Sequence, residues 1–382
     1  MPWSDGTGSR YEQVPDSAPD DASSGNGWCS RNPTAPQPNR DDRDYPIDCR
    51  GSRHSRLPDP ELRGRRQRMD SQPIHLKQSP RVVVIGMATI DYLYVLDSHP
   101  LEDTENPVRR HSVVIGGPAG RGAIAAARLG MGNVALSAMC GVGVHAEVLQ
   151  QLLADEPIAA TFHEADQPSQ HSSVILAADT GSRTTIWTAQ PRADGAMLDS
   201  LPDLLRDADI ALLDCTDPAL TKAAIAACRE LGIATVIDTG GYKESSEEFL
   251  ADVDYIVSPE KFFARRHPDD DLPNSMAKAF ADYQPKVLVA TRGAEGGVYL
   301  DGTGTYGYNA LPVEPVDTCG AGDTFHGSFA WAVGAGAETD QALRIAAWSA
   351  GRKCSVFGND GIPGRAELVE WLTESHVEDR EP

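Results

Sequence analysis

DTCGAGDTF, residues 317–325, is the stretch of this chain that says most about its fold and chemistry. Two carboxylates flank Gly320, Ala321 and Gly322, three small residues that leave their backbone amides uncovered. The residues that follow, 326–336, are small and apolar enough to continue as a buried helix. Uncovered amides at a helix N-terminus favour anions, because the helix dipole and the unpaired N–H groups both attract negative charge.

Asp323 lies in the first turn of this expected helix. A loop-to-helix junction with Asp as a capping residue is the simpler interpretation of a short G-x-G-D sequence. A carboxylate beside a bound anion can also take a proton from a hydroxyl group, which is the geometry of phosphoryl transfer to an alcohol. The full nine residues favour this second interpretation, with Asp323 as the base and the amides of Gly320, Ala321 and Gly322 as an anion hole.

The composition of the 382 residues is uneven. Residues 1–78 are rich in Pro, Gly, Ser, Asp and Arg without apolar periodicity, so we expect a disordered extension. Residues 1–68 contain 11 Arg and 11 acidic residues, so the net charge of −22 belongs to the rest of the chain. A folded body this acidic is a poor nucleic-acid binder. Met69 is a candidate for the natural start.

The cysteines and the apolar runs bear on location. Seven cysteines are scattered along the chain and are never spaced as metal pairs, which predicts a reducing, cytoplasmic environment. No apolar run approaches the ~20 residues that cross a bilayer, and residues 1–78 lack the apolar region of a signal peptide. We therefore expect no membrane partner.

From Arg81 onward, short β-branched runs alternate with Ala- and Leu-rich helical patterns. This alternation is typical of an α/β sandwich with a mainly parallel sheet. The expected strands are 82–85, 134–138, 210–213, 235–237, 255–257 and 287–290. The expected helices are 120–129, 146–153, 218–231, the stretch after Asp323, 341–354 and 365–373.

Two segments interrupt the alternation, residues 94–115 and 170–192. Within the second, residues 172–188 read as a hairpin whose two β-rich runs flank the turn-forming residues 179–182. The two segments predict a small sheet laid over the main one. The expected domain then spans residues 79–375 and is followed by an acidic tail, 376–382.

The nine-residue motif resembles the C-terminal signature D-T-x-G-A-G-D-x-F of the PfkB, or ribokinase-like, family of small-molecule kinases. The resemblance extends from Arg81 to near Thr373. It implies a ribokinase-like three-layer α/β/α sandwich, in which a β lid covers the sugar and often forms a homodimer interface. It also implies ATP-dependent phosphorylation of a primary hydroxyl of a sugar, with Asp323 as the catalytic residue.

The substrate side of the expected site lies in the first part of the domain. Asp91 follows the first buried strand, where ligands of open α/β sheets bind, and the matching Asp of the family binds the sugar. Gly116 and Gly117 begin a helix that fits the family's N-terminal signature, although such glycines also let a helix pack tightly on a sheet.

Two positions of that helix depart from the family pattern. Pro118 and Arg121 stand where many sugar kinases have Asn. Arg121 would favour an anionic group on the substrate, or else point into solvent. Arg183 matches a lid arginine of ketohexokinase-like sequences that faces the active site, or is a cation that protects a hairpin edge.

The nucleotide side is expected from two later segments. Thr291, Gly293 and Gly296 match the T-x-G-x-x-G that lines ATP in the family. Lys353 and Gly358 lie in AGRKCSVFGNDGI, which resembles the adenine border of ketohexokinases, although Lys353 could equally be a solvated helix residue.

The expected cofactors are ATP and Mg²⁺, and the resemblance leaves a monovalent cation such as K⁺ open. The magnesium ligands are the faintest part of the pattern, with Glu260 and Asp238 as candidates. The ketohexokinase-like features and the GGPA sequence, which resembles sulfofructose kinases, favour a ketohexose or an anionic ketose derivative as substrate. A nucleoside kinase of the same fold, with Trp187 against the base, and a non-catalytic sugar-sensing relative are the alternatives.

Overall fold

The computed structural model describes residue 76 and residues 79–378. The expected disorder of residues 1–78 and the candidate start at Met69 therefore fall outside the described residues, apart from Leu76. The last four residues of the predicted acidic tail, 379–382, also fall outside them.

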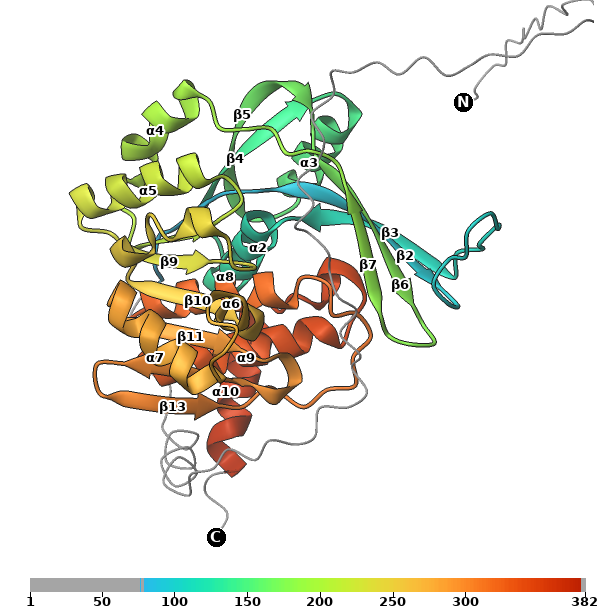
Figure 1. Ribbon diagram of the computed structural model, residues 1–382. Coiled ribbons are helices and arrows are strands. Elements are labelled where there is room, and N and C mark those ends of the chain that lie inside the picture. The colour runs from blue at the N-terminus through green and yellow to red at the C-terminus, as the bar shows by residue number, and fades with distance from the viewer. Residues whose placement is uncertain (1–75, 77–78, 379–382) are drawn as a thin grey trace, which may run out of the picture. The chain divides into compact units, whose positions relative to one another are not determined.

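The core of the structure is one large sheet of nine strands (Figure 1). These strands are β1 (Val82–Ile85), β4 (Val134–Val142), β5 (Ile158–Pro168), β8 (Ile210–Asp214), β9 (Ala234–Asp238), β10 (Tyr255–Pro259), β11 (Val287–Thr291), β12 (Gly297–Asp301) and β13 (Gly304–Tyr308). Their order is β13-β12-β11-β10-β9-β8-β1-β4-β5. Every neighbouring pair from β11 to β5 is parallel, whereas β12 and β13 form an antiparallel edge.

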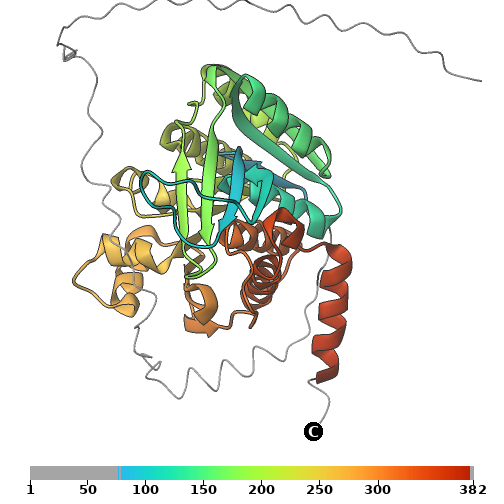
Figure 2. The ribbon, with the colours of Figure 1, turned by 90° about the vertical axis from the view of Figure 1, so that its right-hand side faces the viewer.

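Helices cover both faces of this sheet (Figures 1 and 2). Alternate side chains of β1 enter two separate cores, Val82 and Val84 on one face and Val83 and Ile85 on the other. The first core is covered by α2 (Pro118–Gly130), α3 (Val144–Ala154), α8 (Ala321–Gly334), α9 (Thr339–Cys354) and α10 (Arg365–Glu378). The second is covered by α4 (Gly195–Leu205), α5 (Pro218–Leu231), α6 (Glu260–Arg266) and α7 (Leu272–Tyr283). The short 3₁₀ helices are η1 (Glu244–Ser246), η2 (Leu250–Asp252), η3 (Gly293–Glu295) and η4 (Gly358–Gly361).

A second sheet forms the lid, which projects to the right of the main sheet in Figure 1. Its strands are β2 (Thr89–Leu96), β3 (Arg110–Gly116), β6 (His171–Ala177) and β7 (Arg183–Trp187), in the order β3-β2-β6-β7. One face packs on the C-terminal part of the chain, because Leu93, Val114 and Val174 share a buried cluster with Cys319 and Phe357. The lid therefore contacts the loop that carries the DTCGAGDTF motif.

The predicted three-layer sandwich with a mainly parallel sheet and a small β lid is confirmed. The expected strand 82–85 and the expected helix 218–231 match β1 and α5 residue for residue. The last expected helix, 365–373, is longer and ends at Glu378, so α10 includes the start of the predicted tail. The helices α4, α6 and α7, the strand β5 and the antiparallel partner β13 were not predicted.

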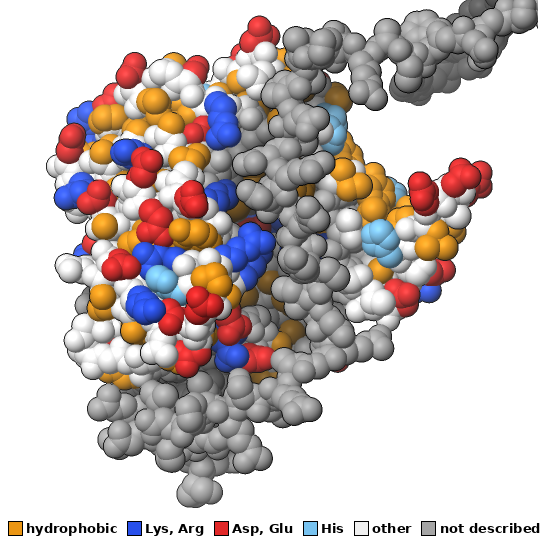
Figure 3. All heavy atoms as spheres, viewed as in Figure 1, with side chains coloured by type: hydrophobic (Ala, Val, Ile, Leu, Met, Phe, Trp, Pro, Cys, Tyr) orange, Lys and Arg blue, Asp and Glu red, His pale blue; other side chains and the backbone are white. Residues whose placement is uncertain are grey.

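The surface of the described part carries mixed charge. On the face shown in Figure 3, acidic and basic side chains are interspersed over the main body, and hydrophobic side chains gather along the lid. Among the helices that the structure describes, none has both the length and the apolar character to cross a bilayer.

Two glycines set how closely α2 and α8 approach each other. A Cβ atom on Gly327 of α8 would overlap the carbonyl oxygen of Gly122 on α2. Because neither helix can move far without disturbing the sheet beneath it, we expect Gly327→Ala to lower the free energy of unfolding by about 1–3 kcal/mol. Urea denaturation of the purified variant measures this change.

Gly195→Ala is the matched control for that experiment. Gly195 begins α4, and a Cβ atom there would meet no atom within 4 Å. Alanine has the higher helix propensity, so this control should be unchanged or slightly more stable. A Gly327→Ala variant as stable as the control would contradict the tight crossing of α2 and α8.

Candidate active site

The N-termini of α2 and α8 meet at the carboxyl edge of the parallel strands. Gly117, at the N-cap of α2, has φ of +81°, and Gly320, at the N-cap of α8, also has φ of +81°. This left-handed backbone conformation favours glycine at both positions. Both helices thus direct the positive ends of their dipoles toward the same region.

The DTCGAGDTF loop carries the predicted anion hole. A Cβ atom on Gly322 would meet nothing within 4 Å, and Gly322 is exposed to solvent. The amides of a first helical turn have no acceptor within their own helix, so they can bind an external anion. Within the predicted anion hole, Gly322 is exposed, whereas Gly320 is buried and the amide of Ala321 donates to the carbonyl oxygen of Thr318 at 3.3 Å. The role of the three amides stays a prediction.

The guanidinium of Arg121 joins the two carboxylates predicted to act on the substrate. Its Nη2 atom lies 2.6 Å from Oδ2 of Asp91, and its Nη1 atom lies 3.4 Å from Oδ2 of Asp323. Arg121 comes from the first turn of α2, Asp91 from β2 of the lid and Asp323 from the first turn of α8. The three segments are therefore joined by one cation at the expected meeting point of sugar and base.

Arg121 is 4% exposed, so the alternative that it points into solvent is wrong. Burial alone would lower the pKa of its guanidinium, but charge interactions with Cys319, Asp91 and Asp323 outweigh burial and raise that pKa. The residue is a permanent cation whose charge is shared between two carboxylates.

The glycines around Arg121 provide the space for this arrangement. A Cβ atom on Gly116 would overlap the carboxylate of Asp91, and one on Gly320 would lie 2.5 Å from Cδ of Arg121. Gly116 and Gly320 thus have a packing role, beside whatever contact they make with a ligand.

Asn359 is a further member of this cluster that the sequence analysis did not identify. Its Oδ1 atom accepts a hydrogen bond from Nε of Arg121 at 3.4 Å, and its Nδ2 atom donates to the carbonyl oxygen of Ile115 at 2.8 Å. Asn359 thus links η4 to the end of β3. Its position inside the GNDG turn was a signal, because Asn in a buried turn usually fixes neighbouring backbone.

The predicted nucleotide residues divide into two groups. Thr291 ends β11, and a Cβ atom on Gly293 would meet nothing within 4 Å, so the loop after β11 leaves room for a ligand. Gly296 has φ of +77°, and a Cβ atom there would overlap the backbone oxygen of Tyr308. The packing of β13 therefore explains why position 296 is a glycine, independently of any contact with ATP.

Lys353 and Gly358 form the second group, and both contact Asp317. The side chain of Lys353 is 0% exposed and its Nζ atom is 2.9 Å from Oδ2 of Asp317, so the alternative of a solvated helix residue is wrong. The amide of Gly358 donates to the same carboxylate oxygen at 2.9 Å. Contact of either residue with ATP stays a prediction, and the ammonium is enclosed against Asp317 here.

The candidate magnesium ligands differ in environment. Asp238 ends β9, and burial raises the pKa of its carboxyl, an effect that nearby His326 opposes. Glu260 begins α6 and is half-exposed, with Arg292 Nε at 3.3 Å from its Oε1 atom. No group of three or more His, Cys, Asp or Glu side chains in the described residues is arranged to hold a metal.

The carboxylate oxygens of Asp238 and Glu260 are of the ligand type that Mg²⁺ prefers. Mg²⁺ keeps several waters and commonly uses one or two protein carboxylates together with substrate phosphates. The negative charge of Asp323 helps to raise the pKa of Asp238, whose Oδ2 atom lies 3.3 Å from Nδ1 of His326 and whose Oδ1 atom accepts a hydrogen bond from the Gly240 amide at 2.8 Å. Asp238 and Glu260 stay the predicted ligands of the ion, which would supply positive charge to the phosphate oxygens.

Asp214 was also missed by the sequence analysis. It ends β8 beside Asp238 in register, and its Oδ2 atom accepts the Met87 amide at 2.7 Å. Burial raises the pKa of this carboxyl. Asp214 anchors the loop that leads from β1 into the lid strand of Asp91, and its place at a strand end was the signal that could have identified it.

The register of the lid places Arg183 and Trp187 relative to Asp91. Asp91 stands opposite Ser172, and Ser172 opposite Trp187, so these side chains share the face of the lid that turns to the site. Arg183 shares that face but lies at the other end of β7, four residues before Trp187 and about 13 Å from it. Arg183 is exposed and stays a predicted substrate ligand.

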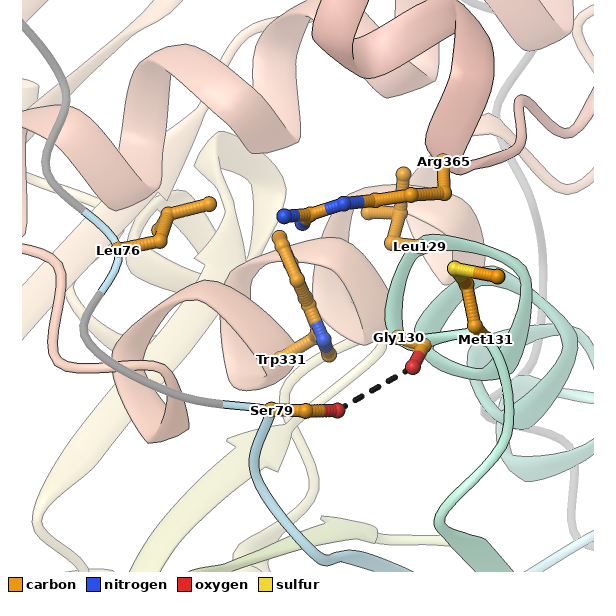
Figure 4. Close-up of a pocket in the computed structure, with 7 residues that line it drawn as sticks. All are labelled: Leu76, Ser79, Leu129, Gly130, Met131, Trp331 and Arg365. Atoms are coloured by element: carbon orange, nitrogen blue, oxygen red, sulfur yellow. Dashed lines mark hydrogen bonds between the residues drawn. The ribbon is translucent and has the colours of Figure 1, made fainter.

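A separate cavity of about 250 Å³ lies at the opposite ends of α2 and α8 (Figure 4). It is lined by Leu129, Trp331 and Arg365 among others, and the Arg365 guanidinium lies 5.4 Å from the Trp331 ring centre. An α2 of 13 residues spans about 20 Å, so the cavity is distant from the predicted site.

The profile of the pfkB family carbohydrate kinases matches residues 79–361. The chain belongs to this family. It is therefore an ATP-dependent carbohydrate kinase, and the non-catalytic sensing alternative is not retained.

Curated relatives of this kinase include both sugar and nucleoside kinases. It is 26% identical over 307 residues to the ribokinase of Bacillus subtilis, covering 76% of this chain and 99% of that protein. It is also 26% identical over 313 residues to a nucleoside kinase of Methanothermobacter thermautotrophicus, covering 76% of this chain and 95% of that protein. The relatives support a sugar or nucleoside kinase and leave the substrate open.

Solved structures share the fold of the kinase. The Giardia lamblia ribokinase has a TM-score of 0.69 and 16% identity, covering 78% of this chain and 99% of that one. The Arabidopsis thaliana ribokinase complexed with ribose and ATP has a TM-score of 0.66 and 22% identity, covering 77% and 98%. The Escherichia coli phosphofructokinase-2 in complex with potassium has a TM-score of 0.66 and 16% identity, covering 78% and 99%.

Proposed function

We propose that this kinase transfers the γ-phosphoryl group of ATP to a primary hydroxyl of a ketohexose or a ketose derivative. The observation that carries the proposal is the Arg121 guanidinium, which binds Asp91 and Asp323 at once. A sugar whose neighbouring hydroxyls bind Asp91 then presents its terminal hydroxyl near Asp323. The reacting oxygen and the base are thereby held in one arrangement before transfer.

The proton and the charge follow from the same residues. Asp323 accepts the proton of the attacking hydroxyl, and the amides of Gly320, Ala321 and Gly322 face the charge that develops on the transferred phosphoryl group. The lid excludes water, which would otherwise accept the phosphoryl group and hydrolyse ATP. Thr291 and Gly293 border the nucleotide in this proposal.

The charge balance favours a neutral sugar over an anionic one. Arg121 contributes one positive charge to a cluster that also contains the carboxylates of Asp91 and Asp323, and both of them contact it. A sugar phosphate or sulfonate placed there would add negative charge to a cluster that already carries an excess of it, which is unfavourable in a buried site. We therefore place fructose-like neutral ketoses ahead of their anionic derivatives.

A coupled ADP-release screen over fructose, ribose, fructose phosphates, sulfofructose and nucleosides tests this order. We expect kcat/KM for a neutral ketohexose to exceed that for its phosphate by about tenfold or more, equivalent to at least ~1.4 kcal/mol of discrimination. A higher kcat/KM for an anionic ketose would instead support Arg121 as an anion receptor.

A nucleoside kinase is the second candidate, because Trp187 lies on the site-facing side of the lid and is 67% exposed. An indole in that position can stack on a base. Trp187→Ala separates the candidates, since it should raise KM strongly for a nucleoside and little for a free sugar. The same screen reports both substrates.

We also propose that the outer face of the lid forms a homodimer interface. Val113, Tyr92, Ser173 and Ile186 stand opposite one another on the face that turns away from Asp91. Tyr92 packs against His145 of α3, whereas Val113 is 37% exposed and Ile186 is 61% exposed, so these two residues present apolar surface. We expect light scattering to give the mass of a dimer for the wild type and of a monomer for Ile186→Lys.

A further inference from the structure

Lys353 and Asp317 form a charged pair whose two side chains are both 0% exposed. Lys353 lies in the last turn of α9, and Asp317 is the first residue of the DTCGAGDTF motif. The Nζ atom of Lys353 lies 2.9 Å from both Oδ2 and the backbone oxygen of Asp317. The ammonium therefore touches the base of the loop that forms the anion hole.

The carboxylate of Asp317 holds two further segments in place. Its Oδ1 atom accepts the amide of Cys319 at 2.8 Å, and its Oδ2 atom accepts the amide of Gly358 at 2.9 Å. The amides of Val316 and Asp317 bind the carbonyl oxygen of Cys354 at 2.8 and 3.1 Å. These contacts thus join residues 316–320, here called the anion loop, to the end of α9 and the start of η4 around a single cation.

Stability alone does not explain such a pair. The free energy of removing two charges from water is about as large as that gained from their attraction, and apolar residues of similar volume often give equal stability. The contacts of Asp317 are instead specific in direction, since they fix the backbone between Val316 and Gly320 immediately before the amides that would face the phosphoryl group. Their geometric role is to hold that backbone in one conformation.

The same contacts bear on the monovalent cation that the family resemblance left open. A cation that stabilised this loop would need the loop's inward carboxylate and neighbouring carbonyl oxygens. Asp317 is that carboxylate, and the Lys353 ammonium already binds it together with the Asp317 carbonyl oxygen. The ammonium therefore occupies the position where the carboxylate and the carbonyl oxygen of Asp317 could together bind K⁺.

We propose that Lys353 is a positioning residue, an internal cation that fixes the anion loop and makes turnover independent of added monovalent cations. This inference rests on the proposed phosphoryl transfer only where turnover is the measurement. It assigns Lys353 to the loop and not to the nucleotide.

The first test uses the unaltered kinase. We expect the same kcat, within about twofold, in buffers whose monovalent cation is K⁺, Na⁺ or tetramethylammonium at equal ionic strength. A kcat that rises severalfold specifically with K⁺ would overturn the proposal. If no substrate in the screen is turned over, the proposed function has failed separately, and the stability measurement below still decides the inference.

The second test removes the ammonium and returns it from solution. Lys353→Ala should lower kcat by about 100-fold, because a loop displaced by about 1 Å misplaces the phosphoryl group, while KM for the sugar changes little. Ammonium or methylammonium chloride should raise the kcat of Lys353→Ala at least tenfold, and tetramethylammonium chloride, the salt control, should not. Full activity of Lys353→Ala, or a loss that no small cation reverses, would contradict the role of the charge.

A matched variant and a stability measurement complete the experiment. Lys222→Ala removes a helix lysine whose partner, Glu248, is exposed. Its kcat should equal that of the wild type and should not change when ammonium chloride is added. The melting temperature of Lys353→Ala should rise with ammonium chloride, and that of the wild type should not. Should Lys353→Ala fail to fold, the neutral pair Lys353→Met with Asp317→Asn replaces it. Wild-type kcat in that double variant would overturn the proposal.

Discussion

Asp323→Asn is expected to lower kcat by about 10²–10⁴-fold, which is the contribution of a positioned general base. The amide cannot accept the hydroxyl proton, yet it has nearly the shape of the carboxylate, so the predicted anion hole of Gly320 to Gly322 should persist. The dissociation constant for ATP should therefore stay within about twofold of the wild type. Steady-state kinetics and calorimetric titration of ATP measure the two quantities.

The control for this variant is Asp199→Asn, which removes one carboxylate from the exposed side of α4. It changes the net charge by the same amount without touching the site. Asp323 would lose its assignment if its substitution weakened ATP binding and left turnover unchanged. It would also lose the assignment if Asp199→Asn reduced kcat to the same extent.

Local signals explain which elements could be predicted. The helix α5 has Asp217 at its N-cap, Pro218 at its first position and Gly232 as a left-handed C-cap, so both of its ends are encoded nearby. The helix α4 also has an N-cap, Asp194, but Pro202 lies inside it and argues against a helix. It forms because Met197 and its partners one and two turns later enter the core, a tertiary gain absent from the local pattern.

The site follows the same division between local and tertiary information. The motif at Asp317–Phe325 predicted the base and the anion hole, because an anion site at a helix start is encoded within a few residues. The contact of Arg121 with Asp91 and Asp323 joins residues 30 and 202 positions apart, so no local pattern could show it. Burial likewise decides Lys353, whose helical position suits a solvated lysine equally well.

Removal of Arg121 is expected to have the second large effect. In Arg121→Gln, the buried carboxylate of Asp91 and the partly exposed carboxylate of Asp323 lose their shared cation and repel each other. Breaking one partner of a buried pair typically lowers the free energy of unfolding by about 3–5 kcal/mol. We expect kcat/KM to fall by about 100-fold as well, because Asp91 and Asp323 lose their common orientation. Urea denaturation and steady-state kinetics give the two values.

The double variant Asp91→Asn with Arg121→Gln separates charge from geometry. It removes one negative and one positive charge together, so much of the lost stability should return, whereas kcat/KM should stay low because the sugar has lost its carboxylate. Equal stability of the single and double variants would show that the Asp91–Arg121 contact contributes little to the folded state.

The pattern of loss across substrates then distinguishes the two roles of Arg121. An anion receptor loses kcat/KM selectively for sugar phosphates and sulfonates, because only those ligands contact its charge directly. A residue that holds Asp91 and Asp323 in place loses it by the same factor for neutral and anionic sugars, because both depend on the same two carboxylates. The shared contacts at 2.6 and 3.4 Å favour the second outcome, and a selective loss would return the anionic ketose to first place.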